Sequence, residues 1–287
     1  MLVDGRATRS QIRGRWFSSI PCLLAGQRGS SPELDAMRAL TNGRLCKPLV
    51  LILAGGDGTR IGRLGRLLPK PLMAISPQQT PLSRLLDQLL SLPHAHAIVS
   101  TAPAWSSYLT AFVERYVLHR ERNGTGNPDL TVEINAAHAV GPISALSYLA
   151  ERYNSEHYLI CLADIVFLTN PFARFTSGMF KNAVVTAPFE AGRGGVAASR
   201  AGTLHEIFHH DAECAFDQGL EHSNWTGLAC LPAAALKTHA GPHDQVLEEM
   251  INAHVAQGSR VEVCEGPQFI NMNGPNDLRR CWVEHLN

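Results

Sequence analysis

The sequence predicts an α/β fold with a largely parallel sheet flanked by helices, and three observations support this prediction. The run Leu49–Leu53 is apolar, has the length of a strand, and ends abruptly in a glycine-rich segment. From Leu49 onward, strand-like and helix-like segments alternate along the chain. Apolar residues make up 45% of the 287 residues and charged residues 17%, which is typical of a globular protein with a sizeable core.

Overall charge and cysteine usage argue against several classes of protein. Lys and Arg together number 25, as do Asp and Glu, and the sequence pI is about 7.2, so no nucleic-acid-binding surface is indicated. No window approaches the roughly 18 consecutive apolar residues that a membrane-spanning helix needs. The seven cysteines are scattered and form no CxxC pair, which favours a reduced, cytoplasmic setting and argues against a zinc ribbon.

Residues 1–46 differ in composition from the rest of the chain. Arginines recur there among serines and glycines, and no acid lies between Asp4 and Glu33. This composition superficially resembles an organelle transit peptide, but no clean amphipathic or signal-type segment is present. We therefore expect a flexible extension, or residues upstream of a true start at Met37, followed by a single domain over 47–287.

The elements after Leu53 are predicted from spacing and from turn residues. Thr80–Leu92 has leucines at helical spacing and stops at Pro93, whereas the segment 120–129 has the composition of a loop. His157–Phe167 predicts one buried strand interrupted by a single acid. The other predicted elements are strands over 97–100, 130–134, 183–188, 195–199, 203–209, 224–231 and 260–263, a turn at 201–202, and helices over 106–119, 142–153, 244–257 and 277–286.

The segment Gly55-Gly56-Asp57-Gly58-Thr59-Arg60, followed by Lys70 between two prolines, has the composition of a polyphosphate-binding loop. Glycines allow backbone conformations that a Cβ would forbid, and consecutive exposed N–H groups form an anion site. Arg60 offers a planar fork to phosphate oxygens, and Lys70 offers a point charge. Neither the P-loop spacing nor GxGxxG is present. An ordinary strand-to-helix turn is the simpler alternative.

The segment LAGGDGTRIGRLGRLLPKPL closely resembles the signature LAGGxGTRLxPLTxxxPKPL of the sugar-1-phosphate nucleotidyltransferases, and departs from it mainly at Gly62–Leu67. The resemblance runs from Pro48 to the end of the chain and implies a Rossmann-like mixed α/β fold of the GT-A-like nucleotidyltransferase type. It implies that Arg60 and Lys70 stabilise charge during catalysis. The nucleotide-binding residues that it implies are Leu53, Ala54, Gly55, Gly56, Gly58, Thr59 and, beside the base, Gly141.

Asp164 lies in the run LICLADIVF, which is otherwise too apolar to hold a charge without a use for it. At the carboxyl end of a parallel strand, it would project into the crevice in which such sheets bind ligands. The family has its metal-binding Asp in an LGD segment at this point, so the resemblance implies that Asp164 holds Mg²⁺. A strand-end Asp that caps the next turn is the simpler alternative.

The segment NMNGPNDL, which begins at Asn271, resembles the family's second metal segment, DxGTPEDL. Asn271 stands where the family usually has an Asp. Its amide oxygen can ligate Mg²⁺ but contributes no negative charge, so a weakened second ligand is implied. The segment also resembles that of the molybdenum-cofactor nucleotidyltransferases. A loop-to-helix junction capped by Asn276 is compatible with either role.

Two segments of the second half resemble the sugar-binding part of the family. In Gly202–Asp211, His209 and His210 occupy positions where the family has Glu-Lys, whose lysine meets the sugar phosphate. A histidine can donate to a phosphate but is only partly charged at neutral pH. The segment from Ser223 to Leu228 resembles a strand whose backbone meets the sugar. The substrate contacts implied by the resemblance are therefore His210, Thr226 and Gly227.

A remote alternative comes from His205-Glu206-Ile207-Phe208-His209, which is a literal HExxH zinc-hydrolase motif. That motif requires a helix, so that both histidines share one face. The segment instead follows a turn and alternates in the manner of a strand, and the chain contains 13 histidines, so a chance match is the simpler interpretation.

The reaction implied by the resemblance is attack of a sugar-1-phosphate on the α-phosphorus of a nucleoside triphosphate, with release of pyrophosphate. Such transfer requires positioning and charge neutralisation more than covalent chemistry. A nucleoside triphosphate and a sugar-1-phosphate are the expected partners, with neither nucleic acid nor membrane. A regulatory homologue with little turnover is the competing hypothesis, favoured by Asn271 and by the pair His209 and His210. The base, the sugar and the oligomeric state stay open, with a homo-oligomer among the expected states.

Overall fold

The computed structural model of the protein describes most of the chain after Pro48. The leader predicted over 1–46 lies outside the described residues, and its interpretation stays a prediction. The described residues are 49–56, 58–124, 130–135, 141–175, 182–209, 219–237 and 246–285.

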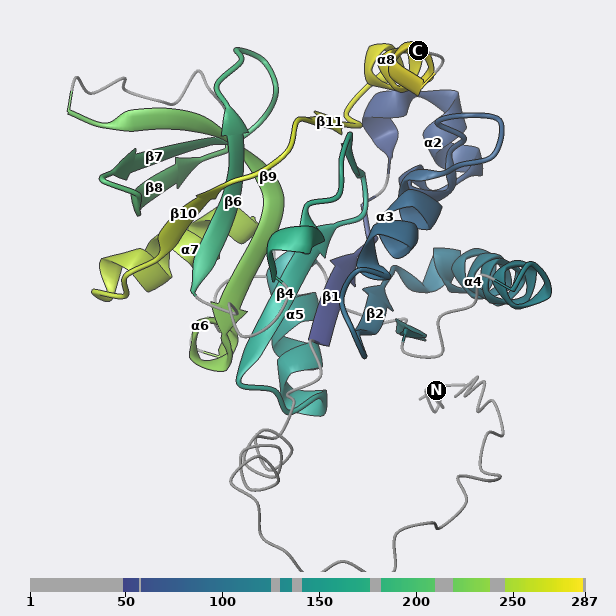
Figure 1. Ribbon diagram of the computed structural model, residues 1–287, viewed down its shortest axis with the longest axis horizontal. Helices are drawn as coiled ribbons and strands as arrows, with labels where there is room; N and C mark the ends of the chain where they lie inside the picture. The colour runs from purple at the N-terminus through teal and green to yellow at the C-terminus, as the bar shows by residue number, and fades with distance from the viewer. Residues whose placement is uncertain are drawn as a thin grey trace, which may run out of the picture. The chain divides into compact units, whose positions relative to one another are not determined.

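Two β-sheets form within this part of the chain. The strands are β1 Leu49–Leu53, β2 His96–Ser100, β3 Thr131–Asn135, β4 His157–Leu162, β5 Ile165–Phe167, β6 Ala183–Pro188, β7 Val196–Arg200, β8 Thr203–Phe208, β9 Glu221–Pro232, β10 Glu262–Glu265 and β11 Phe269–Asn271. Nine of them form one sheet in the order β3-β2-β1-β4-β9-β6-β10-β8-β7 (Figure 1), and β5 pairs with β11 in a separate ribbon.

The large sheet is mixed. Strands β3, β2, β1 and β4 are parallel to one another, and β10 is parallel to β6. The long strand β9 is antiparallel to β4, β6 and β7, and β7 and β8 form an antiparallel hairpin. The predicted α/β fold with a Rossmann-like mixed sheet is therefore confirmed.

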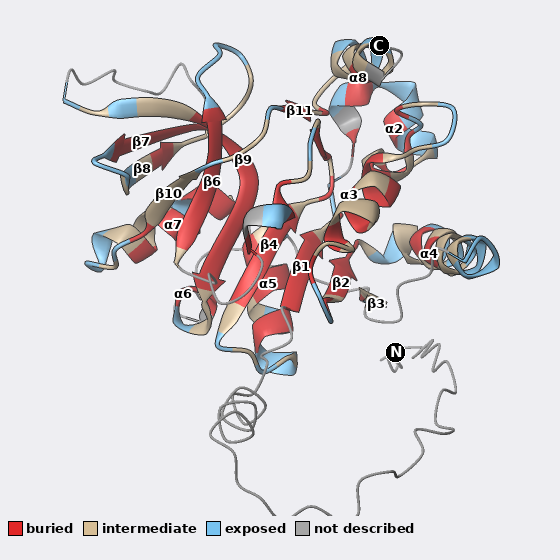
Figure 2. Cartoon of the chain, in the orientation of Figure 1, coloured by how far each residue is buried: buried red, intermediate tan, exposed pale blue. Residues whose placement is uncertain are grey.

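Helices cover both faces of the sheet and bury its strands (Figures 1 and 2). Val50 and Ile52 of β1 pack in the cluster that contains α3 and α4, whereas Leu49 and Leu51 pack with α5, α6 and α7. Burial on both faces explains why this strand is a continuous apolar run. The helices are α2 Arg63–Leu67, α3 Pro81–Leu89, α4 Ser106–Arg122, α5 Gly141–Arg152, α6 Ala233–Lys237, α7 Leu247–Ala256 and α8 Pro275–His285, with 3-10 turns η1 Thr59–Ile61, η2 Lys70–Leu72, η3 Pro103–Trp105 and η4 Phe172–Phe175. None of the helices in the described residues is long and apolar enough to cross a membrane.

Helix α4 corrects the loop predicted over 120–129, because the helix continues to Arg122. The guanidinium of Arg120 forms an ion pair with Asp87 of α3 at 2.5 Å, and the Nδ2 of Asn123 lies 3.0 Å from the Nε2 of His119. These contacts stabilise the last turn of α4. The tertiary contact with Asp87 therefore keeps this segment helical despite its loop-like composition. Residues 125–129 lie outside the described part of the chain.

The single strand predicted over His157–Phe167 is two strands that belong to different sheets. Strand β4 ends at Leu162, and the N–H of Ala163 makes a last hydrogen bond to the carbonyl of Leu53 at 3.0 Å. Strand β5 then pairs with β11. The chain changes sheets at Asp164, so the acid does not interrupt a ladder but stands at the junction between two.

Candidate active site

The carboxyl ends of β1 and β4 lie side by side, with Leu53 in register with Leu162. The glycine-rich segment follows β1, and its Gly55 and Gly56 are exposed, whereas Leu53 and Ala54 are more buried. Because parallel strands end at one edge of the sheet, this segment and Asp164 after β4 share that edge.

Lys70 and Asp164 form an ion pair in which the Nζ donates to Oδ2 at 2.9 Å. The Lys70 side chain is 12% exposed and the Asp164 side chain 26%, so both are partly withdrawn from water while remaining open on one side. Pro69 and Pro71 flank the lysine, and each fixes its own φ, which limits the backbone freedom of the segment that presents the ammonium group. Lys70, the predicted catalytic cation, and Asp164, the predicted metal ligand, therefore meet at this edge of the sheet.

Backbone contact holds the glycine-rich segment against helix α2. Gly58 has φ of +62°, and a methyl group at Gly65 would lie 1.9 Å from the carbonyl oxygen of Gly58. A methyl group at Gly58 would in turn lie 3.5 Å from the Cγ of Lys70. The two glycines thus allow the loop, α2 and the lysine to pack together without side chains between them.

Arg60 lies in η1 and is exposed, and it makes no hydrogen bond or ion pair to any residue that the structure describes. Its guanidinium is therefore available to an anion beside the loop. Thr59 begins η1, but its side chain lies outside the described part, as does Asp57.

Strand β11 brings Asn271 next to Asp164. Asn271 pairs with Ile165, and the N–H of Met272 donates to the carbonyl of Asp164 at 3.0 Å. The described residues contain no group of three His, Cys, Asp or Glu side chains that could hold a metal ion. Mg²⁺ commonly takes one or two protein ligands together with substrate phosphates, and one carboxylate plus one amide oxygen fit that arrangement.

The junction after β11 corrects the predicted cap. Helix α8 begins at Pro275, so Asn276 already lies within its first turn. The carboxylate of Asp277 accepts the N–H groups of Asn273 at 2.9 Å and Gly274 at 2.8 Å. Asp277 therefore accepts from the two N–H groups that directly precede the helix, and its charge also suits the helix dipole.

The residues predicted for the sugar side have different surroundings. Thr226 is fully buried, and its Oγ1 donates to the carbonyl of Val185 at 2.8 Å. Gly227 has φ of +73°, and a methyl group there would lie 2.8 Å from Leu162 and 3.2 Å from Ile165, the residues that flank the Asp164 junction. The structure thus brings Gly227 to the junction and uses the Thr226 hydroxyl for the sheet.

Two other predicted positions lie at or beyond the limits of the described residues. His210 lies outside them. Gly141 opens helix α5 with φ of +81°, directly after the undescribed residues 136–140.

The HExxH alternative is wrong, because its residues lie on a strand. His205 to Phe208 belong to β8, and His209 follows it. The Nδ1 of His209 instead contacts the carboxylate of Glu248 at 3.2 Å. Without a helix, the two histidines and the glutamate do not form the zinc-binding face that the motif requires.

Sequence reasoning missed the loop between β6 and β7. The Arg193 guanidinium forms an ion pair with Glu190 at 2.5 Å and lies 3.5 Å from the carbonyl of Phe269. A methyl group at Gly194 would lie 3.1 Å from the side-chain nitrogen of Asn271. Two consecutive glycines near an arginine were the available signal, since the loop after β1 also has this combination.

The family described as "MobA-like NTP transferase domain" matches residues 50–225, which is more than half of the chain. A search of curated proteins finds no match.

Solved structures match over nearly their whole length. A putative glucose-1-phosphate thymidylyltransferase from Bacillus anthracis is 15% identical with a TM-score of 0.64, covering 82% of this chain and 94% of that chain. The inositol-1-phosphate CTP transferase from T. maritima is 12% identical, with a TM-score of 0.63 and coverage of 84% and 96%. UTP-bound UGPase from Acinetobacter baumannii is 12% identical, with a TM-score of 0.65 and coverage of 83% and 93%. At these identities, the likeness establishes the fold.

Proposed function

Because the chain belongs to the MobA-like NTP transferase family and is a nucleotidyltransferase, we propose that its acceptor is a sugar-1-phosphate and its product a nucleoside diphosphate sugar. An oxygen of the acceptor phosphate attacks the α-phosphorus of the triphosphate, and the bond to the β-phosphate breaks to release pyrophosphate. The observation that supports this proposal most directly is the Lys70–Asp164 ion pair at the open edge below the glycine-rich loop.

Each residue has a role that suits its environment. The exposed N–H groups of the loop bind the triphosphate, and the exposed guanidinium of Arg60 stabilises charge on the phosphates. Asp164, with Asn271 as the second ligand, would hold Mg²⁺, which would supply neutralisation of phosphate charge. Lys70 donates to the Asp164 carboxylate and fixes its orientation at this edge.

Two structures of similar fold are named as transferases of small phosphate esters, glucose-1-phosphate and inositol-1-phosphate. These names agree with an acceptor of this kind. A second acceptor class, the phosphorylated precursor of the molybdenum cofactor, is favoured by the NMNGPNDL segment and by the MobA-like family. Both acceptors present a phosphate monoester to the same α-phosphorus.

The test measures pyrophosphate release from five nucleoside triphosphates, each with several sugar-1-phosphates or a pterin phosphate, with and without Mg²⁺. Mg²⁺-dependent release with one sugar phosphate supports the proposal, whereas release only with the pterin phosphate transfers it to the second acceptor class. Tight triphosphate binding without release from any acceptor would favour the regulatory homologue.

A further inference from the structure

The ribbon that carries Asp164 and Asn271 is short. Strands β5 and β11 pair over three positions, from Ile165 opposite Asn271 to Phe167 opposite Phe269. Asp164 directly precedes β5 and Asn271 ends β11, so both stand at the same end of the ribbon. Isolated two-stranded ribbons are at best marginally stable in water, so the position of this end depends on how the ribbon is held elsewhere.

The two faces of the ribbon pack into different hydrophobic clusters. Phe167 and Phe269 belong to the cluster that contains α3 and α4. Val166 and Ile270 belong to a smaller cluster with Met272. Apolar burial is non-directional, so these contacts hold the ribbon between two layers without specifying its position along its own axis.

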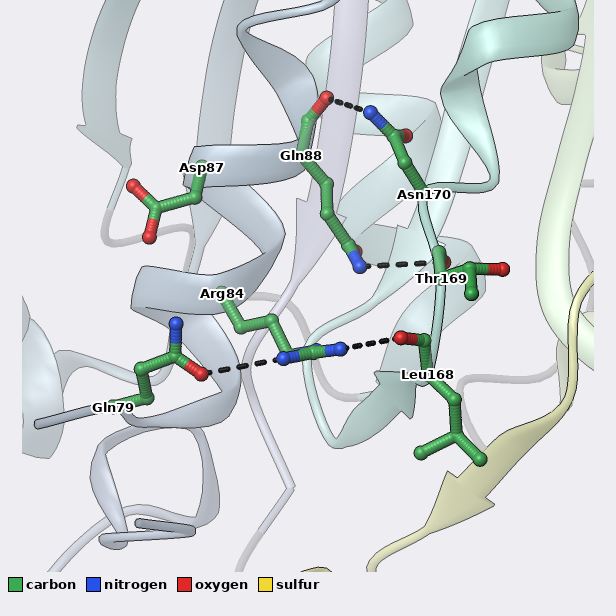
Figure 3. A pocket seen from close by; sticks show the side chains of 7 residues that line it. All are labelled: Gln79, Arg84, Asp87, Gln88, Leu168, Thr169 and Asn170. Atoms are coloured by element: carbon green, nitrogen blue, oxygen red, sulfur yellow. Dashed lines mark hydrogen bonds between the residues drawn. The ribbon is translucent and has the colours of Figure 1, made fainter. Parts of the chain in front are cut away.

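Directional hydrogen bonds from α3 hold the opposite end (Figure 3). The Nη2 of Arg84 donates to the carbonyl of Leu168 at 2.6 Å, as Figure 3 shows. The Nε of Arg84 donates to the carbonyl of Phe167, also at 2.6 Å. The Nε2 of Gln88 donates to the carbonyls of Phe167 at 3.2 Å and Thr169 at 3.3 Å. Because both side chains come from neighbouring turns of one helix, the exit from β5 is fixed relative to α3.

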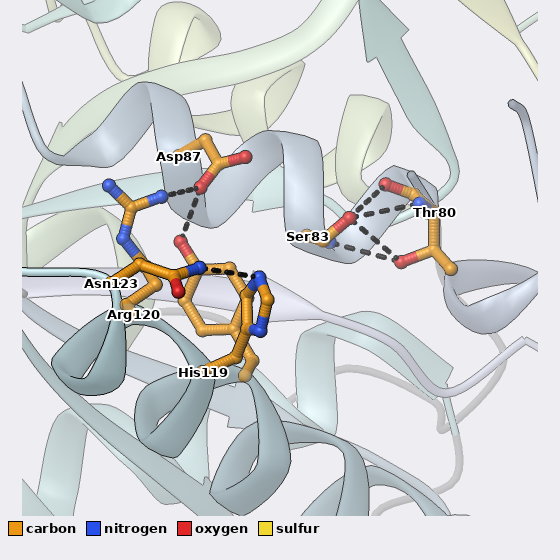
Figure 4. Close-up of polar contacts among 7 residues, drawn as sticks. Thr80, Ser83, Asp87, His119, Arg120 and Asn123 are labelled. Atoms are coloured by element: carbon orange, nitrogen blue, oxygen red, sulfur yellow. Dashed lines mark hydrogen bonds and ion pairs between the residues drawn. The ribbon is translucent and has the colours of Figure 1, made fainter. Parts of the chain in front are cut away.

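Helix α3 is itself anchored on its other sides. At its start, the N–H of Ser83 donates to Thr80 Oγ1 at 3.1 Å, and the N–H of Thr80 donates to Ser83 Oγ at 2.9 Å (Figure 4). On the side facing α4, Asp87 accepts from Arg120 at 2.5 Å and from the hydroxyl of Tyr116 at 2.6 Å. The helix can therefore serve as a fixed support for the ribbon.

A hydrogen bond to Gln79 orients the Arg84 guanidinium for its contact with the ribbon. Its Nη1 donates to the Oε1 of Gln79 at 3.2 Å, which leaves Nε and Nη2 aimed at the two carbonyls. Burial lowers the pKa of Arg84 from its ordinary value, yet an arginine in a protein stays protonated at neutral pH. A planar guanidinium can address two carbonyls at once, whereas a lysine donates from a single point.

We propose that Arg84 is a positioning residue for nucleotidyl transfer: it holds the carbonyl groups at one end of the β5–β11 ribbon and thereby sets where Asp164 and Asn271 stand at the other. This inference rests on the proposed function, since it takes both residues as Mg²⁺ ligands. It assigns a functional role to a side chain that touches neither substrate nor metal.

The test compares Arg84→Ala and Arg84→Lys with Arg120→Ala as the matched control, because Arg120 anchors the same helix from the side away from the ribbon. Mn²⁺ binding is followed by electron paramagnetic resonance with a non-hydrolysable triphosphate analogue. Half-saturating Mg²⁺ is measured in turnover, and melting temperature is recorded. Hydrogen exchange is followed at the Met272 amide, which donates to the Asp164 carbonyl.

In Arg84→Ala, metal binding and half-saturating Mg²⁺ should weaken about tenfold, as for loss of other groups that orient a metal ligand. The Met272 amide should exchange faster, and Arg84→Lys should recover part of each effect. Arg120→Ala should lower the melting temperature while leaving the Mg²⁺ requirement and the Met272 exchange unchanged.

The inference is overturned if Arg84→Ala lowers only the melting temperature, as Arg120→Ala does. It is also overturned if Met272 exchange in Arg84→Ala matches that of the wild type, and this readout does not require catalysis. Failure of the proposed function gives a different result, in which the wild-type protein itself neither binds Mn²⁺ with the triphosphate analogue nor releases pyrophosphate.

Discussion

The two parts of the candidate active site are held in place by different kinds of contact. Around Gly58, Gly65 and Lys70, the backbone determines the geometry, through a positive φ, a glycine-to-glycine contact and two flanking prolines. Along the β5–β11 ribbon that ends at Asn271, side chains from other elements do so, through Arg84 on α3 and the loop that contains Arg193. The first part is therefore specified within about twenty residues of sequence, whereas the second depends on long-range contacts.

The two parts should therefore respond differently to substitutions. Adding a Cβ at a backbone contact disrupts the whole contact, because no change of side-chain rotamer can relieve the clash. A side-chain contact fails in degrees, because neighbouring groups and water can replace some of its hydrogen bonds.

The largest effect is expected for Lys70→Ala. Removing the ammonium group takes away the partner of Asp164 and the cation that we propose acts on the reacting phosphates. We expect kcat to fall by about 10² to 10³, with the circular dichroism spectrum unchanged. Lys237→Ala, which removes the same charge from the end of α6, should keep wild-type turnover. Equal activity of the two variants would show that Lys70 has no catalytic role.

Gly65→Ala should cost about 3 kcal/mol of unfolding free energy, because its methyl group would meet the Gly58 carbonyl at 1.9 Å and force the backbone apart. Urea denaturation measures the loss, and triphosphate affinity should fall with it. The control is Gly124→Ala, at a positive-φ position with open space around it, where about 1 kcal/mol is expected. Similar losses in both variants would mean that the Gly58–Gly65 contact is not important.

Asn271→Asp should lower the half-saturating Mg²⁺ concentration on the order of tenfold, since the substitution adds a negative charge next to Asp164. The measurement is a Mg²⁺ titration of initial rate at saturating triphosphate. Asn273→Asp adds the same charge two residues further on and should have little effect. A higher Mg²⁺ requirement in Asn271→Asp would instead indicate that the two carboxylates repel each other without sharing an ion.

The smallest effect separates two adjacent residues at the start of α8. Asp277→Ala should cost about 1 kcal/mol, because the N–H of Gly274 loses its acceptor and that of Asn273 keeps only the Asn271 carbonyl. Asn276→Ala should stay within about 0.5 kcal/mol. Thermal unfolding of both variants provides the comparison, and a reversed order would restore Asn276 as the cap.

Much of the fold was predictable because the local signals agree with the tertiary structure. Strand Leu49–Leu53 and strand Ala183–Pro188 have the predicted bounds, since buried apolar runs leave little choice of structure. The end of α4 and the split at Asp164 were not predictable, because a distant partner decides each: Asp87 for the helix and β11 for the strand.

The candidate site divides in the same way. Lys70 and Asp164 were each identified by type and surroundings, but they are 94 residues apart, and no local pattern indicates that they form an ion pair. Arg84 gave no signal at all, because an arginine on an amphipathic helix looks like an ordinary solvated residue until its carbonyl partners are known.

The pairing of β5 with β11 also has a consequence for how the protein folds. The parallel strands β1, β2 and β4, with helices α3, α4 and α5, can assemble from residues before 170, but the ribbon closes only when a segment roughly a hundred residues further along the chain reaches it. Closing so long a loop is entropically costly, so during refolding this parallel part of the sheet should form before Asn271 meets Asp164. A refolding chain would then pass through a state in which the glycine-rich loop is nearly complete while Asp164 and Asn271 are still apart, and catalytic activity would return later than native secondary structure.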